Sequence, residues 1–276
     1  SLVCDFIAHN LDQEMSLESL SEVAGFSKYH FHRLFQARMG LSLYEFVQLS
    51  RLKRASYKLA FHPQDRIIDI ALEAGFERPE AFSKAFKRRF GQSPSGFRKC
   101  PNWPLWQSRF TFAHPEGDNM KIDVEIVQFP TTLVAALEHH GPPAELQSTV
   151  ARFIEWRKST GLSPRHSMKT FGVPWNDPNT VAPADFRWDV CGQVTEPIPD
   201  SEFGLVTKEI PGGRCAHVIH RGSQDNMERT IYPLYREWLP ASGEETRDYP
   251  VFFQYHNFFP EVPEVELSAS VYLPLK

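Results

Sequence analysis

Apolar residues between positions 67 and 99 recur at the spacing of two helices separated by a turn. Four residues at i, i+3 and i+4 spacing predict the first helix: Ile67, Ile70, Ala71 and Ala74. Gly75 then interrupts the run, as glycine does at a helix C-terminus. A second amphipathic helix is predicted from about Pro79 to the next glycine, Gly91, with an apolar stripe of Phe82, Ala85, Phe86 and Phe90.

The same arrangement occurs earlier in the chain, between positions 20 and 40. Ala24-Gly25-Phe26 repeats Ala74-Gly75-Phe76, and the apolar stripe recurs as Phe31, Phe35 and Met39, ended by Gly40. A short helix, a glycine turn and a helix with a polar outer face are typical of a helix-turn-helix, whose second helix enters the major groove of DNA. The apolar pattern of residues 43–59 predicts a long helix that joins the two motifs.

The residues of these two motifs carry a family resemblance. The segment GFERPEAFSKAFKRRFGQSPSGFRK and its earlier counterpart GFSKYHFHRLF closely resemble the signature of AraC/XylS-type transcription regulators. The resemblance covers residues 1–99 and implies an all-α DNA-binding domain with two helix-turn-helix units. Because one chain carries both units, it is expected to read an asymmetric site in successive major grooves without a dimer.

The resemblance also implies which side chains read DNA. On the first recognition helix, residues 27–39, the base-facing positions hold Tyr29, His32 and Arg33. On the second they hold Arg78, Glu80, Ser83 and Lys84, while phosphate contacts are expected from Lys28, Lys87 and Arg88. Arg33 can donate two hydrogen bonds to guanine. Glu80 can accept from cytosine or pair with Lys84, and for any single residue a solvated helix face remains the alternative.

Charge is distributed unevenly along the 276 residues. Residues 1–100 hold 15 Lys/Arg and 11 Asp/Glu, a net of +4, whereas residues 101–276 hold 15 and 23, a net of −8. The basic excess concentrates in residues 51–99, with 12 basic against 5 acidic side chains. A basic part followed by an acidic part fits a nucleic-acid module joined to a different domain.

The pattern changes after Cys100. Prolines and the lack of a clear period predict a linker over residues 100–119, with Trp103, Leu105 and Trp106 packing it against a neighbour. Residues 120–276 then read as an α+β domain of two strand–helix–strand–strand repeats. Pro130 corresponds to Pro211 and Gly141 to Gly222, with the same separation in both pairs. Two such units are expected to leave a groove for a ligand.

This second half resembles the GyrI-like effector-binding domain, through VEIVQFPTTLVAALEHHGP and the closing VYLPL. The order of the two domains is that of Rob-type regulators. Aromatic residues of the predicted strands suggest an aromatic ligand site made of Phe171, Trp175, Trp188, Phe253, Tyr255 and Tyr272. Relatives that bind cationic drugs often have Glu where this chain has Phe253, and an acid where it has Ser270. These departures favour a neutral aromatic or apolar ligand.

Other kinds of site find little support. The four cysteines form no CxxC, and the 11 histidines form no ligand pattern, so we expect no metal, no cofactor and no catalytic residues. No run of about 18 apolar residues or signal-like segment stands out, which favours a cytoplasmic protein without a membrane partner.

The expected function is a transcription regulator that binds double-stranded DNA and a small effector. RNA polymerase is a further candidate partner. Two alternatives stay open: a C-terminal domain that contacts a protein instead of a ligand, and a C-terminal hydrolase like some GyrI-like domains.

Overall fold

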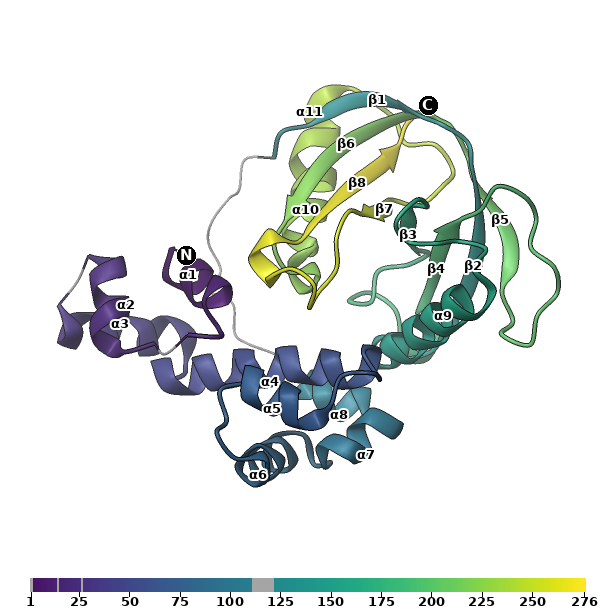
Figure 1. Cartoon of the computed structure of the whole chain (residues 1–276). Helices are drawn as coiled ribbons and strands as arrows, with labels where there is room; N and C mark the ends of the chain where they lie inside the picture. The colour runs from purple at the N-terminus through teal and green to yellow at the C-terminus, as the bar shows by residue number, and fades with distance from the viewer. Residues whose placement is uncertain (1, 14, 26, 111–121) are drawn as a thin grey trace. The chain divides into compact units, whose positions relative to one another are not determined.

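The computed structural model describes residues 2–13, 15–25, 27–110 and 122–276. Within helices α1 and α3, seven side chains lie outside this description: Leu2, Lys28, Tyr29, His30, Leu34, Ala37 and Arg38. The chain divides into two compact units (Figure 1). Unit 1 comprises residues 1–118 and 259–265, and unit 2 comprises residues 119–258 and 266–276.

The described part of unit 1 is helical. Its helices are α1 (Leu2–His9), α2 (Leu17–Ala24), α3 (Lys28–Met39), α4 (Leu43–Phe61), α5 (Ile67–Glu73), α6 (Pro79–Phe90), α7 (Pro94–Lys99) and α8 (Trp103–Ser108). The two predicted helix-turn-helix motifs are therefore α2–α3 and α5–α6. Each turn contains a glycine in the left-handed region, with φ of 70° at Gly25 and 76° at Gly75, where other residues would be strained.

Helix α4 joins the two motifs without a break over its 19 residues, which corresponds to about 28 Å at 1.5 Å per residue. Its first half contributes Leu43 and Val47 to the core of the first motif. Its second half contributes Leu52, Ala55 and Leu59 to the core of the second. A Ser42–Glu45 capping box stabilises its start. The predicted connecting helix is confirmed and ends two residues later than expected.

Basic side chains of α4 fix the two motifs to this helix. The Arg51 guanidinium donates to the carbonyl oxygens of Leu11, at 2.8 Å, and Gln13, at 2.7 Å, in the segment that connects α1 to α2. Arg54 bridges the two motifs, because it pairs with Asp12 and donates to the Glu73 carbonyl oxygen at 2.7 Å. These cations therefore hold protein groups of unit 1.

The predicted linker contains a short helix, α8. Trp103 and Trp106 of this helix are buried in the core of the second motif. The Trp106 indole donates to the Ser56 hydroxyl of α4 at 2.7 Å. The packing expected of these tryptophans is thus confirmed, whereas the linker's residues 111–119 lie outside the described residues.

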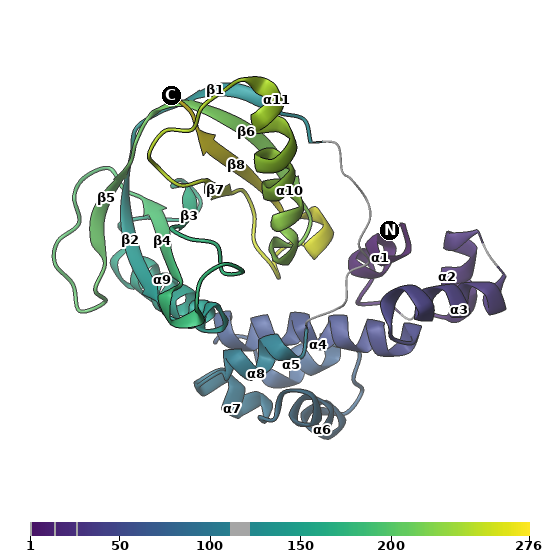
Figure 2. The same cartoon turned by 180° about the vertical axis from the view of Figure 1, so that it is seen from behind.

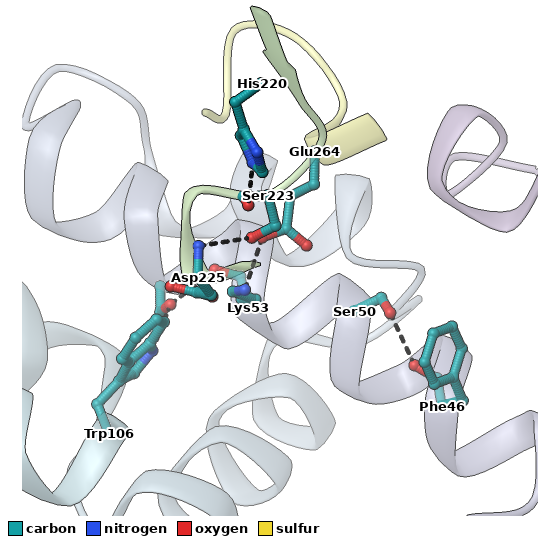
Figure 3. Close-up of polar contacts among 9 residues, drawn as sticks. Phe46, Ser50, Lys53, Trp106, His220, Ser223, Asp225 and Glu264 are labelled. Carbon is teal, nitrogen blue, oxygen red and sulfur yellow. Dashed lines mark hydrogen bonds and ion pairs between the residues drawn. The ribbon is translucent and has the colours of Figure 1, made fainter. Parts of the chain in front are cut away.

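Residues 259–265 belong to unit 1 although they lie between two strands of unit 2. The Phe259 ring meets the Tyr57 ring of α4 edge-on, with centroids 4.9 Å apart. Glu264 forms an ion pair with Lys53 of α4 at 2.6 Å (Figure 3). No local pattern in the sequence indicates this association.

Unit 2 is built on one antiparallel sheet. Its strands are β1 (Glu125–Phe129), β2 (Thr132–His140), β3 (Thr170–Pro174), β4 (Arg187–Gln193), β5 (Val206–Ile210), β6 (Gly213–Arg221), β7 (Phe252–Tyr255) and β8 (Ser268–Pro274). Helix α9 (Leu146–Thr160) belongs to the first repeat. Helix α10 (Glu228–Pro233), a π-helical turn (Leu234–Trp238) and α11 (Leu239–Ser242) belong to the second. Figure 2 shows the same elements from behind.

The strand order β1-β6-β8-β7-β3-β4-β2-β5 places the two repeats in a single eight-stranded sheet. Strands β3 and β7 meet at its centre, where Gly172 lies opposite Phe253. Alternate residues point to opposite faces of each strand. One face packs against α9 and the α10–α11 segment. We call it the helix-covered face. The other we call the helix-free face, because its cluster of buried side chains includes no helix residue among the described residues of unit 2.

The duplication is visible in two buried histidines at corresponding positions of the repeats. His139 contacts the Thr149 hydroxyl at 2.8 Å and the Pro142 carbonyl oxygen at 3.2 Å. His220 contacts the Thr230 hydroxyl at 2.7 Å. It also contacts the Ser223 carbonyl oxygen at 3.1 Å (Figure 3). In each repeat the histidine ties the end of a long strand to the following helix, which confirms the repeat predicted from the sequence.

Candidate nucleic-acid interface and ligand site

Helix α6 separates its apolar and polar residues cleanly. Phe82, Phe86 and Phe90 are buried in the core of the second motif. Five of the six predicted DNA contacts of this motif are exposed, and Ser83 is half-buried: Arg78, Glu80, Ser83, Lys84, Lys87 and Arg88. Positions 80, 84, 87 and 88 share one helical stripe, so their side chains can approach a groove together. Arg78 is the N-cap residue of the helix.

Helix α3 repeats this division. Phe31 and Phe35 are buried, and His32 and Arg33 are exposed. The side chains of Lys28 and Tyr29, also predicted to contact DNA, lie outside the described residues.

Sequence reasoning overlooked one position of α3. From Phe31 onward the two recognition helices align at a constant offset, one residue larger than in the preceding turns, which pairs Phe31 with Phe82 and Phe35 with Phe86. Gln36 then corresponds to Lys87, and Gln36 is exposed one turn after His32 and Arg33. Its place in the repeat was the signal that could have identified it. A glutamine at such a position can bond adenine through both its amide atoms.

Three of the six predicted ligand residues meet on the helix-covered face. The Trp188 and Phe253 ring centroids lie 5.7 Å apart, and those of Phe253 and Tyr255 lie 6.5 Å apart. A Cβ atom at Gly172 would be 2.8 Å from both the Trp188 ring and the Tyr255 hydroxyl oxygen. The two side chains therefore converge over the backbone of Gly172. We call Trp188, Phe253 and Tyr255 the aromatic trio.

The other three residues lie on the helix-free face. Phe171 and Tyr272 pack with Phe129, at centroid distances of 6.1 and 5.0 Å. Trp175 is 38% exposed at the margin of this cluster, and the Lys208 ammonium lies 5.6 Å from its ring centroid. Because a sheet separates the two groups, a single small ligand on one face cannot contact all six residues.

The aromatic trio provides a largely apolar surface with one hydroxyl. Phe253 is almost fully buried, at 1% exposure, whereas Trp188 and Tyr255 are half-buried. Burial raises the pKa of Tyr255, and the nearby Cys191 adds to the effect, so the phenol stays neutral at physiological pH. A neutral phenol can donate or accept one hydrogen bond with a bound ligand.

In the described part of the chain, no three His, Cys, Asp or Glu side chains gather as a metal ion would require. None of the helices described there combines the length and apolar character needed to cross a lipid bilayer.

Comparison with known proteins agrees with this division into a DNA-reading part and a second domain. A model of the GyrI-like small molecule binding domain matches residues 122–276, and a helix-turn-helix domain model matches residues 20–99. The chain belongs to the GyrI-like regulators that carry an AraC-type helix-turn-helix domain. It is a DNA-binding transcriptional regulator with a GyrI-like small-molecule-binding domain.

Individual relatives cover one or both parts. The probable transcriptional regulator YgiV of Escherichia coli K12 is 48% identical over 57% of this chain and 98% of its own length. The right origin-binding protein of Escherichia coli K12 is 34% identical over 84% of this chain and 81% of its own length. Among solved structures, the C-terminal domain of EcmrR has a TM-score of 0.48 at 16% identity, covering 57% of this chain and 99% of that one.

Proposed function

We propose that one chain of this regulator reads an asymmetric DNA site with α3 and α6, using the exposed stripes that hold Arg33 and Lys84. The observation that carries this proposal is the unbroken helix α4, whose two halves each hold the core of one motif. With Arg51 and Arg54 fastening the motifs to α4, both reading helices keep a fixed separation. Successive major grooves lie about 34 Å apart on one side of DNA, so a fixed spacing selects the register of two half-sites.

We propose that the aromatic trio binds a flat, neutral, largely apolar ligand. Phe253 stands where relatives that bind cations often have Glu, and it leaves no carboxylate at that position. The surrounding rings favour stacking. The same lack of an acid supports a binding role over hydrolysis, since catalysis needs a positioned acid or base. A regulator of this kind acts on DNA, and we propose a cytoplasmic location for it.

The connection after β7 offers a route from ligand to DNA. Phe253 and Tyr255 lie on β7, and four residues beyond it the chain enters segment 259–265, which packs on α4 through Phe259 and Glu264. A ligand changes DNA binding only if it binds one arrangement of the protein better than another. Movement at the end of β7 would reach the helix that spaces the two motifs.

The test of DNA reading starts with selection of bound duplexes from a random pool by the full-length protein. An asymmetric site of about two helical turns, bound by one chain, is the expected result. A palindrome bound by two chains would refute reading by a single chain.

The test of ligand binding measures tryptophan fluorescence while 2-naphthol is added as a flat neutral probe. Trp188→Phe should remove most of the ligand-dependent quenching, whereas Trp175→Phe, on the helix-free face, should keep it. Equal effects of both variants, or no saturable quenching, would reject the proposed site and favour a domain that contacts a protein partner.

A further inference from the structure

Two histidines share one buried serine on the helix-free face. Ser270 of β8 is only 4% exposed. Its hydroxyl oxygen lies 2.9 Å from Nε2 of His217, on β6, and 3.0 Å from Nε2 of His256, which follows β7. His256 also contacts the Ser268 hydroxyl through Nδ1, at 3.2 Å. Three chain segments thus bring two imidazoles and two hydroxyls together.

The hydrogen bonds of this group depend on how many of its two imidazoles are protonated. A serine hydroxyl has one proton to donate and two lone pairs that accept. With both imidazoles neutral, Ser270 can donate to one ring nitrogen and must accept from the other. An imidazole that takes up a proton becomes a donor at both its nitrogens. When both imidazoles are protonated, Ser270 accepts from both, and its own hydroxyl proton then needs another acceptor.

The strand register adds two more cations. Arg221 of β6 is paired with Ser268 of β8. The His256 amide donates to the Ser268 carbonyl oxygen at 3.1 Å. On the other side of β7, Thr170 pairs with Tyr255, so Lys169 comes next to His256. Arg221, Ser268, His256 and Lys169 therefore form one row across four neighbouring strands, on the face that also holds His217.

Little negative charge balances this group. Glu125 of β1 lies 4.0 Å from Nδ1 of His217, and its side chain is 71% exposed. In the described part of the chain, neither Lys169 nor Arg221 forms an ion pair. The pKa of His256 is lowered by burial and then by the positive charges of His217, Lys169 and Arg221. An anion at this position would reverse the effect of those charges.

Catalysis is a poorer explanation of the same geometry. Glu125, His217 and Ser270 stand in the order of a carboxylate–histidine–serine relay. Ser270, however, lies inside a strand that pairs with β6 on one side and β7 on the other. The backbone amides around it are engaged in the sheet, so they cannot serve as the oxyanion donors that acyl transfer requires.

We propose that Lys169, His217, Arg221, His256, Ser268 and Ser270 form a binding site for a small phosphate-class oxyanion, separate from the aromatic trio. Histidine, arginine, lysine and hydroxyl donors suit phosphate oxygens. A small anion fits better than a DNA backbone, because residues 101–276 carry a net charge of −8 that repels a long polyanion. Besides Glu125 on β1 and His256 after β7, Tyr272 of β8 faces His217, with the two rings stacked at 5.0 Å.

The test uses full-length protein with isotope-labelled histidine and inorganic phosphate as the probe. Phosphate should move the NMR signals of His217 and His256 with one saturable constant, and should raise the pH at which both rings titrate. Binding should tighten as the pH falls from about 8 to about 6, through the range in which histidine gains its proton. Chloride at equal ionic strength is the control ion.

Matched variants separate the site from general charge effects. His256→Gln should weaken phosphate binding about tenfold or more, and Lys169→Gln should weaken it by a smaller factor. His140→Gln and Arg187→Gln, exposed positions on β2 and β4, should leave it unchanged. Ser270→Asp, which places a carboxylate between the imidazoles, should abolish binding and raise the titration midpoints of both histidines without phosphate.

Three outcomes would overturn the proposal. The first is that phosphate leaves the signals of His217 and His256 unmoved, and the second is that the control variants lose as much affinity as His256→Gln. Displacement of phosphate by a duplex that lacks the operator sequence is the third, because it would show that the group contacts the DNA backbone instead. Since none of these readouts involves tryptophan quenching, they leave the proposed aromatic site untouched.

Discussion

Arg51→Met should destabilise unit 1 without changing the number of phosphates that the protein contacts. Methionine keeps most of the aliphatic length of arginine and removes both hydrogen bonds from the guanidinium to Leu11 and Gln13. The basic excess of residues 51–99 would, by charge alone, count Arg51 as a DNA contact. The structure instead gives its donors to carbonyl oxygens of the segment between α1 and α2.

The size of the effect follows from these two bonds. A hydrogen bond from a charged donor contributes roughly 1.5–3 kcal/mol, and the low end applies because Arg51 is half-exposed. Since the two carbonyl oxygens can regain water in the variant, we expect a loss of about 2–3 kcal/mol for unit 1. Gly75 adds a constraint, since a Cβ there would lie 2.8 Å from the Arg51 Cζ atom. The guanidinium therefore fits closely between the two motifs.

Two measurements distinguish a structural cation from a DNA contact. Urea unfolding gives the free energy, and the salt dependence of operator binding gives the number of phosphates neutralised. Log K falls as log salt rises, and each lost phosphate contact makes this slope shallower by about 0.9. Arg51→Met should keep the slope. Lys87→Ala, on the exposed face of α6, should make it shallower by about one unit and leave stability unchanged.

A flatter salt slope for Arg51→Met, together with unchanged stability, would refute this reasoning. It would mean that the bonds to Leu11 and Gln13 give way to phosphate contacts when DNA binds. Arg51→Lys offers a further check. Lysine keeps the charge but lacks the planar fork that serves two carbonyl oxygens, so it should recover only part of the stability.

Three further predictions concern single side chains. Arg33→Ala should cost about 1–3 kcal/mol at one base pair and relax specificity there, measured by titrating operator variants; equal weakening on all sequences would make Arg33 a phosphate contact. Burial lowers the pKa of His220 from 6.5, so the unfolded chain takes up the proton first and unit 2 should lose stability as the pH falls below that value. The urea midpoint measured against pH should show this loss, and His220→Gln should reduce it. Trp106→Phe should cost about 1–2 kcal/mol in urea unfolding, because the buried Ser56 hydroxyl loses its donor.

The helices and their pairing could be predicted from the sequence because their signals are local. Phe82, Phe86 and Phe90 recur at the period of a helix that is buried along one side. Gly25 and Gly75 mark turns that need a left-handed residue. Repetition strengthened each prediction, since the helix-turn-helix pattern appears twice in the first domain and the strand–helix–strand–strand pattern twice in the second.

The candidate ligand site was harder to predict, because a strand presents two faces. Phe171 and Trp188 were grouped by their position in the predicted strands, but the faces on which they lie depend on the register of each strand. Helices α9 and α10 cover one face only, and this decides which rings meet. The pairing of Gly172 with Phe253 joins two repeats that are distant in the sequence, and no local sequence pattern predicts such a contact.

Strand β7 connects the proposed aromatic site, the proposed oxyanion site and the segment that packs on α4. Alternation places Phe253 and Tyr255 on the helix-covered face, while His256 just beyond the strand contacts Ser268 and Ser270 on the other. The chain then continues into segment 259–265, held on α4 by Phe259 and by the ion pair of Glu264 with Lys53. If the two proposed sites bind ligands, each ligand would act on the same strand end. In the proposed mode of DNA reading, α4 sets the spacing of α3 and α6, so a displacement there would alter both half-site contacts together and change affinity for a whole operator.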